Sequence, residues 1–235
     1  MHIREIHFQS ELYPARDRYP FNLPAFLNTG ILDLSSPVTF FVGDNGTGKS
    51  TLLRALCRKA DVFIWGGFGE VTPEEEAFHR AIELRWNAGP VPGSFFSSEL
   101  FFNFAQVADH DPAMREFFGP RTFETQSHGQ SLMSYFRSRY RIKGLYFLDE
   151  PETAMTPRGQ VDLLRLLHEM SRDGHAQFII ATHSPILLAC PGARLYTFDG
   201  PSVRPIAYRD TEHYRFYRAF LENPQSFLAA QDDKR

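Results

Sequence analysis

Several features are scarce in this sequence, and each absence narrows the class of protein. Only two of the 235 residues are cysteines, and neither Cys57 nor Cys190 has neighbours typical of a metal site. We therefore expect reduced thiols rather than a disulfide framework. No apolar run approaches the roughly 20 residues that span a bilayer, and residues 1–6 carry too much charge for a secretory signal peptide. These absences predict a cytoplasmic protein with no direct membrane insertion.

Charge and periodicity exclude further classes. The net charge is −3, so the chain lacks the overall basic surface typical of nucleic-acid-binding proteins. Heptads and internal repeats are absent, which argues against a coiled coil or a solenoid. With 43% hydrophobic residues, the chain has enough material for one large α/β domain. Strand-like segments alternate with helical patterns, which is typical of a mostly parallel sheet.

The segment at residues 43–50, GDNGTGKS, matches the pattern G-x-x-x-x-G-K-[ST]. An apolar run precedes it and a helical pattern follows, which favours a phosphate-binding P-loop over an ordinary glycine-rich turn. Glycines let such a loop turn its N–H groups toward phosphate oxygens, and the following helix adds a partial positive charge. Ser50 is expected to hold Mg²⁺ as well. The predicted nucleotide-binding residues here are Asp44, Asn45, Gly46, Thr47, Gly48, Lys49, Ser50 and Thr51.

Two further apolar runs end in chemically active side chains. Residues 145–148 are followed by Asp149 and Glu150. Asp149 is the predicted Mg²⁺ partner, and Glu150 is the predicted base that orients the attacking water. Residues 177–182 precede His183, which is expected to sense the γ-phosphate. The alternatives are an ordinary acidic turn and a structural histidine.

Taken in this order, the three motifs resemble those of the ABC-type ATPase heads. Residues 126–130 stand where that family carries its Leu-Ser-Gly-Gly-Gln signature; Ser127, Gly129 and Gln130 match it, whereas Gln126 and His128 do not. Residues 153–156 are similar to the family's D-loop. The resemblance covers roughly residues 38–200. It adds Ser127 and Gly129 as nucleotide contacts.

The resemblance implies an α/β P-loop NTPase fold. Its parts would be a mostly parallel sheet with flanking helices, a small N-terminal antiparallel β part and an inserted subdomain that bears the signature. We divide this single domain into residues 1–67 (the β part and the P-loop), 68–141 (the inserted subdomain), 142–200 (the acidic motif, D-loop and His183) and 201–235 (a helical tail).

Within the family, the chain most resembles small stand-alone ATPases related to the SMC and RecF heads. Pro151, Glu152 and residues 182–185 carry this resemblance, and residues 60–125 are too few for the long coiled coil of SMC proteins. The resemblance implies Mg-ATP hydrolysis, an ATP-dependent homodimer, and a soluble protein effector or a DNA repair or defence process. The alternatives are the nucleotide-binding subunit of a transporter and a nucleotide-dependent scaffold with little turnover.

Some positions stay open at this stage. The additional Mg²⁺ contact that the family implies falls on Glu99 or on Gln106, and we favour Glu99. The aromatic that stacks on adenine is Tyr19 or Phe21, unless both are ordinary core or loop residues. Residues 135–143 mix basic and aromatic side chains, which suits either DNA contact or a helix end whose aromatics face the core.

Overall fold

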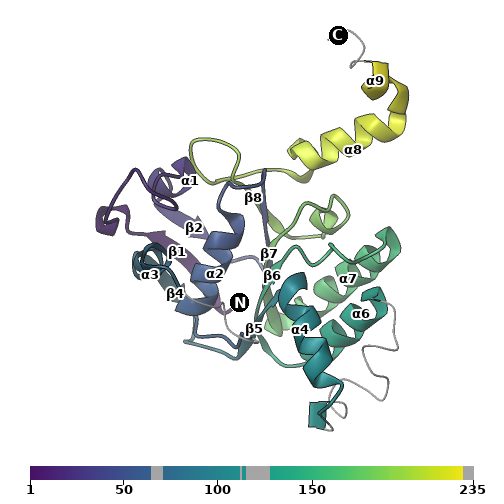
Figure 1. Cartoon of the computed structure of the whole chain (residues 1–235), viewed down its shortest axis with the longest axis horizontal. Coiled ribbons are helices and arrows are strands. Elements are labelled where there is room, and N and C mark those ends of the chain that lie inside the picture. The colour runs from purple at the N-terminus through teal and green to yellow at the C-terminus, as the bar shows by residue number, and fades with distance from the viewer. Residues whose placement is uncertain (65–70, 112, 115–127, 230–235) are drawn as a thin grey trace.

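A six-stranded sheet forms the centre of the computed structural model, which describes residues 1–64, 71–111, 113–114 and 128–229 (Figure 1). All neighbouring strands in it are parallel except the last pair, β8 and β9. Across the sheet the strands are β5 (Gly93–Ser97), β6 (Gly144–Asp149), β7 (Ala176–Ala181), β3 (Val38–Val42), β8 (Arg194–Thr197) and β9 (Arg204–Pro205).

The register of this sheet brings the predicted motifs to one edge. Ser97 pairs with Asp149, Asp149 pairs with Ala181, and Ala181 pairs with Phe41. These residues form one row near the carboxyl ends of four parallel strands, where ligands of α/β proteins commonly bind. Segments that are far apart in the sequence therefore meet here.

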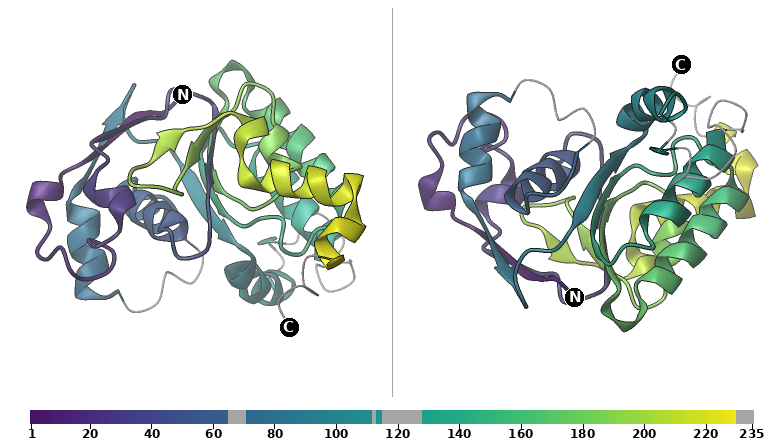
Figure 2. Two further views of the ribbon diagram at one scale, coloured as in Figure 1. Left: turned by 90° about the horizontal axis from the view of Figure 1, so that it is seen from above. Right: turned by 90° about the horizontal axis from the view of Figure 1, so that it is seen from below.

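A hydrophobic core lies on each face of the six-stranded sheet. Successive side chains of a strand point to opposite faces of the sheet. On β3, Phe41 joins one core while Val38, Phe40 and Val42 join the other. Helices α4 (Ser98–Ala108), α6 (His128–Arg139) and α7 (Pro157–Met170) cover that second face. Helix α2 (Lys49–Lys59) covers the first face (Figure 2).

A small antiparallel sheet lies on the far side of α2. Its strands are β2 (Ile31–Asp33), β1 (Ile3–Phe8) and β4 (Ile82–Trp86), in the order β2-β1-β4. Helix α3 (Pro73–Arg80) packs on α2 and begins with a capping box between Thr72 and Glu75. Because β4 pairs with β1, the antiparallel part extends past residue 67, where our division from the sequence placed its end.

One glutamine joins the two sheets. Gln177 on β7 is fully buried, and its side-chain oxygen accepts the backbone N–H groups of His2 and Ile3, each at 2.8 Å. Its nitrogen donates to the carbonyls of Ile3 at 2.9 Å and Leu34 at 2.7 Å. The amide therefore satisfies backbone groups of the antiparallel part that would otherwise be buried without partners.

The remaining helices are short or project from the body. Helix α1 is Pro24–Leu27, and 3-10 turns occur at Ser10–Leu12, Arg172–Gly174, Leu187–Ala189 and Tyr208–Asp210. Helices α8 (Glu212–Glu222) and α9 (Pro224–Ala229) extend away from the two sheets (Figure 1). Among the residues that the structure describes, no helix is both long and apolar enough to cross a membrane.

Candidate nucleotide site

The loop between β3 and α2 depends on two of its glycines for its shape. Gly43 and Gly48 have φ angles of 143° and 100°, in the region that side chains disfavour. A Cβ atom at Gly43 would lie 2.8 Å from Oδ1 of Asp199, and one at Gly48 would lie 2.7 Å from the Phe26 ring. These glycines are therefore required by the neighbouring protein atoms, whatever the loop binds.

Lys49 is held inside this loop. Its side chain is buried, and Nζ donates to the carbonyls of Gly43 and Asp44, each at 2.7 Å. Burial lowers the pKa of Lys49, while the carboxylates of Asp199, Glu150 and Asp149 oppose that shift. Two of the three ammonium protons are thus used to hold the loop. The Lys49 ammonium group lies at the carboxyl end of the parallel sheet, in a position to bind an anion.

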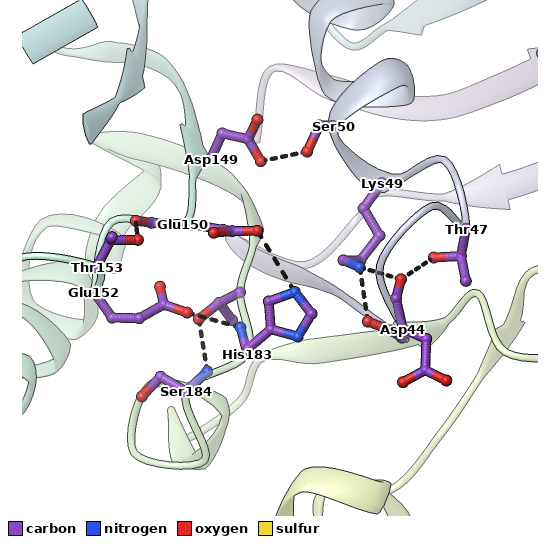
Figure 3. A network of polar contacts seen from close by, with 12 residues as sticks. Asp44, Thr47, Lys49, Ser50, Asp149, Glu150, Glu152, Thr153, His183 and Ser184 are labelled. Atoms are coloured by element: carbon purple, nitrogen blue, oxygen red, sulfur yellow. Dashed lines mark hydrogen bonds and ion pairs between the residues drawn. The ribbon is translucent and has the colours of Figure 1, made fainter. Parts of the chain in front are cut away.

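Ser50 and Asp149 meet across the space between α2 and β6. The Ser50 hydroxyl donates to Oδ1 of Asp149 at 2.8 Å (Figure 3). Burial raises the pKa of Asp149, and the hydrogen bond from Ser50 opposes the shift. Within the described ranges no group of three or more His, Cys, Asp or Glu side chains could hold a metal ion. A hydroxyl beside a carboxylate fits Mg²⁺, which is usually held by one or two protein oxygens together with phosphates and water.

Glu150 follows Asp149 in a strained conformation. Its φ is 47°, and its backbone N–H donates to the carbonyl of Ala181 at 2.9 Å. The hydroxyl of Thr153 donates to the Glu150 carbonyl at 3.0 Å. This backbone turns the half-exposed carboxylate toward His183, with 3.5 Å between Oε1 and Nε2 (Figure 3). Strain of this kind is typical of functional positions.

His183 has polar neighbours on three sides. Its backbone N–H donates to Oε1 of Glu152 at 2.7 Å, its Nε2 faces Glu150, and its Nδ1 lies 2.9 Å from Nε2 of His213. Burial lowers the pKa of His183, and the positive charge of Lys49 adds to that effect. The side chain is therefore a neutral imidazole at neutral pH, oriented toward the loop that contains Lys49.

The turn after Glu150 is tied to the loop after His183. The Ser184 hydroxyl donates to Oε1 of Gln160 at 2.6 Å, and Nε2 of Gln160 donates to the carbonyl of Met155 at 3.2 Å. Burial raises the pKa of Glu152, whose carboxylate accepts the His183 N–H. Residues 153–156, which resemble a D-loop, are thus mechanically connected to the histidine.

Two residues at this site were not predicted. Oδ1 of Asp199, just after β8, accepts the backbone N–H of Asp44 at 2.7 Å, so this N–H of the loop already has a partner. His213 reaches His183 from α8. The sequence predicts a helical tail at residues 201–235 but carries no local sign that this tail returns to the site.

The signature-like segment is described only in part. Ser127 lies outside the described residues. Gly129 is in the first turn of α6, and a Cβ atom there would lie 3.8 Å from the carbonyl oxygen of Ala154. The start of α6 is therefore next to the D-loop-like turn of the same chain.

The candidates for adenine and Mg²⁺ contacts differ in position. Phe21 is fully buried among Tyr13 and Phe78, so it is a core residue and not a stacking platform. Tyr19 is half exposed, and its hydroxyl contacts that of Thr51 at the start of α2. Glu99 is in the first turn of α4 and Gln106 is two turns later; their side chains are outside the described part.

The basic and aromatic stretch at residues 135–143 faces the core with its aromatics. Phe136 and Tyr140 are buried against Phe96 and Phe178. Arg139 lies over the Phe63 ring, 5.9 Å from its centroid. The buried rings of this segment are thus unavailable for stacking on bases.

Known protein families match two separate parts of this chain. A family model for an AAA domain matches residues 22–84, and a second, described as "AAA domain, putative AbiEii toxin, Type IV TA system", matches residues 131–189. A protein of Methanothermobacter marburgensis named "Putative ABC transporter ATP-binding protein" is 37% identical over 59 residues. That match covers 25% of this chain and only 21% of the relative.

Similar solved structures include the SMC head domain from Thermotoga maritima. It is 15% identical, with a TM-score of 0.50, and the match covers 88% of this chain and 100% of the head. CbiO1 from Clostridium perfringens, part of the ABC transporter complex CbiONQ, is 17% identical with a TM-score of 0.47 over 86% of this chain and 91% of its own.

The site and the fold define a P-loop protein with the architecture of ABC-type ATPase heads. The mostly parallel six-stranded sheet and the small antiparallel sheet agree with the fold that the sequence predicted. The predicted resemblance to ABC-type and SMC ATPase heads is confirmed in the fold, and AAA-domain family models match two parts of the chain.

Proposed function

We propose that this chain binds Mg-ATP and hydrolyses it. The observation that carries the proposal is the convergence of Lys49, Ser50, Asp149, Glu150 and His183 at one edge of the parallel sheet. These side chains supply a cation for phosphate oxygens, oxygen ligands for a metal ion, and a carboxylate next to an imidazole. Phosphoryl transfer needs little more from a protein than such positioning and charge stabilisation.

Each residue has a distinct role in this proposal. Lys49 binds the β- and γ-phosphates, and the loop from Asn45 to Thr51 contributes backbone N–H and hydroxyl groups. Ser50 and Asp149 hold Mg²⁺, which neutralises charge on the phosphates when bound. Glu150 accepts a proton from the attacking water. His183 donates from Nε2 toward the γ-phosphate and the Glu150 carboxylate.

Two finer assignments belong to the same proposal. Tyr19, which touches Thr51 beside the loop, is the residue positioned to cover the adenine. Glu99 follows β5, and Ser97 at the end of β5 pairs with Asp149 in the sheet. That placement supports Glu99 rather than Gln106 as the additional contact to Mg²⁺.

Two substitutions test the activity. Lys49→Ala should abolish tight nucleotide binding, because a buried phosphate loses its cation. Glu150→Gln should bind Mg-ATP but hydrolyse it about 10²–10⁴-fold more slowly, because an amide cannot take a proton. Glu169→Gln, at an exposed glutamate of α7, is the matched control. Near-wild-type turnover by Glu150→Gln would assign the base elsewhere, and unchanged binding by Lys49→Ala would remove the loop from the mechanism.

The proposal extends to an ATP-dependent pair of chains. The resemblance to ABC and SMC heads supports a two-fold arrangement in which Ser127 and Gly129 of one chain cover the nucleotide of the other. In that arrangement ATP joins the two chains and hydrolysis separates them. The cycle would drive a soluble effector or a DNA repair or defence process. The family description that names a toxin supports a defence process.

A transporter subunit is the second candidate. The name of the Methanothermobacter relative favours it, although the match spans about a fifth of that protein. Co-purification of the tagged chain with a membrane protein would support this role. ATP turnover that responds to DNA and needs no membrane partner would favour the first candidate.

A further inference from the structure

The first turn of α8 is anchored to the loop that follows β7. Thr211 is buried, and its hydroxyl caps α8 by accepting the Tyr214 N–H at 3.3 Å while donating to the Tyr208 carbonyl at 2.7 Å. The Tyr208 hydroxyl donates to the carbonyl of Pro185, two residues after His183, at 2.9 Å. His213, the second residue of α8, is therefore held in place against His183.

The donor and the acceptor in the hydrogen bond between these two imidazoles can be assigned. Nδ1 of His183 lies 2.9 Å from Nε2 of His213, so one nitrogen must donate and the other accept. Nε2 of His183 faces the Glu150 carboxylate at 3.5 Å, which favours a proton on that nitrogen. Burial lowers the pKa of both histidines, so each ring carries a single N–H. Nδ1 of His183 is then the acceptor and Nε2 of His213 is the donor.

We propose that His213 is a positioning residue that holds His183 in the Nε2–H tautomer by donating to its Nδ1. The proposal rests on the function proposed above, because it gives the Nε2–H group of His183 its use. Only this tautomer presents an N–H toward Glu150 and the phosphate side of the site. In the other tautomer a bare nitrogen lone pair would face the carboxylate and the phosphate oxygens, which repel it.

The α8 helix thereby becomes part of the site. None of the residues of α8 is buried, and its apolar side chains at Phe216, Tyr217, Phe220 and Leu221 are exposed. The position of His213 consequently depends on the contacts of Thr211 and Tyr208.

The tautomer can be measured without nucleotide or turnover. The full chain is labelled with imidazole-¹⁵N histidine, and long-range ¹H–¹⁵N correlation spectra distinguish the two tautomers. His183→Gln identifies the His183 signals. We expect the Nε2–H form in the wild-type chain and a mixture of tautomers in His213→Ala. His213→Gln should restore the Nε2–H form, because the glutamine amide nitrogen is as many bonds from Cβ as Nε2 of histidine.

Turnover supplies the second readout. His213→Ala should lower kcat by about 10–100-fold, the range known for hydrogen-bond partners of metal-bound histidines, with the affinity for Mg-ATP unchanged. His213→Gln should recover most of the loss. His168→Ala, at an exposed histidine of α7, is the matched control and should behave as wild type.

The outcomes separate this inference from the proposed function. A wild-type chain with no ATP turnover refutes the proposed function, while the tautomer spectra still decide the role of His213. An Nδ1–H tautomer in the wild type, or no change in His213→Ala, overturns the inference. So does a glutamine variant as impaired as the alanine variant, or a loss confined to nucleotide affinity.

Discussion

Replacing Glu150 by glycine should stabilise the unliganded protein while abolishing turnover. Glu150 has a φ of 47°, in the left-handed region. The local turn demands this conformation, since the Glu150 N–H bonds to Ala181 and its carbonyl accepts from Thr153. Glycine adopts such angles without a steric penalty. The substitution therefore separates the backbone strain from the carboxylate chemistry, with Glu150→Gln as the reference.

The size of the effect follows from opposing contributions. Left-handed backbone costs a residue with a Cβ atom about 1–2 kcal/mol. The glycine variant loses about 0.5–1 kcal/mol of this gain, because glycine has more conformational freedom in the unfolded chain. The Glu150 side chain is 45% exposed, so the loss of its contact with the neutral His183 ring in the glycine variant adds little to the difference. Glu150→Gly should thus be more stable than Glu150→Gln by about 0.5–1 kcal/mol.

Thermal unfolding without nucleotide measures this difference. For a chain of this size, about 1 kcal/mol corresponds to about 2–4 °C in Tm. Asp173→Gly is the matched control: Asp173 has a φ of 55° on an exposed turn, so it should gain stability without losing turnover. A Glu150→Gly protein with a Tm equal to or below that of Glu150→Gln would refute the strain argument, provided that Asp173→Gly gains as expected.

Two other predictions concern the assembly and the joint between the sheets. In light scattering, the Glu150→Gln protein should be monomeric without nucleotide and dimeric with Mg-ATP. Adding Ser127→Arg should block the dimer while ATP still binds. A double variant that dimerises would show that the signature assignment is wrong. Gln177→Leu should lower the free energy of unfolding in urea by at least about 2 kcal/mol, since each buried backbone group left unpaired costs about 1–3 kcal/mol. An unchanged urea midpoint would mean that water or a shifted backbone replaces the hydrogen bonds of the amide.

Local patterns in the sequence predicted much of the fold. The helical pattern that follows the glycine-rich loop in the sequence forms the helix Lys49–Lys59. The strands that end at Val42, Asp149 and Ala181 lie at apolar runs of the sequence, although the limits of the last two differ slightly from those runs. Spacing within a few residues encodes such elements. The roles of the site residues remain predictions for the experiments above.

Other features depended on pairings that no local pattern encodes. The sequence does not show that the strand Ile82–Trp86 pairs with β1, because strand partners are decided by the packing of distant segments. Phe21 and Tyr19 are both aromatics of one proline-rich segment, and only burial separates the core residue from the exposed one.

The candidate nucleotide site shows most clearly what each level of structure determines. The sequence by itself determined the glycine-rich loop, the carboxylates at the end of β6 and the histidine after β7, because each motif is contiguous and has a chemistry of its own. Tertiary structure alone decided that Asp199 holds the loop and that His213 contacts His183. Both lie in segments without a local motif, and they reach the site only because β8 pairs beside β3 and the first turn of α8 packs against the loop after β7.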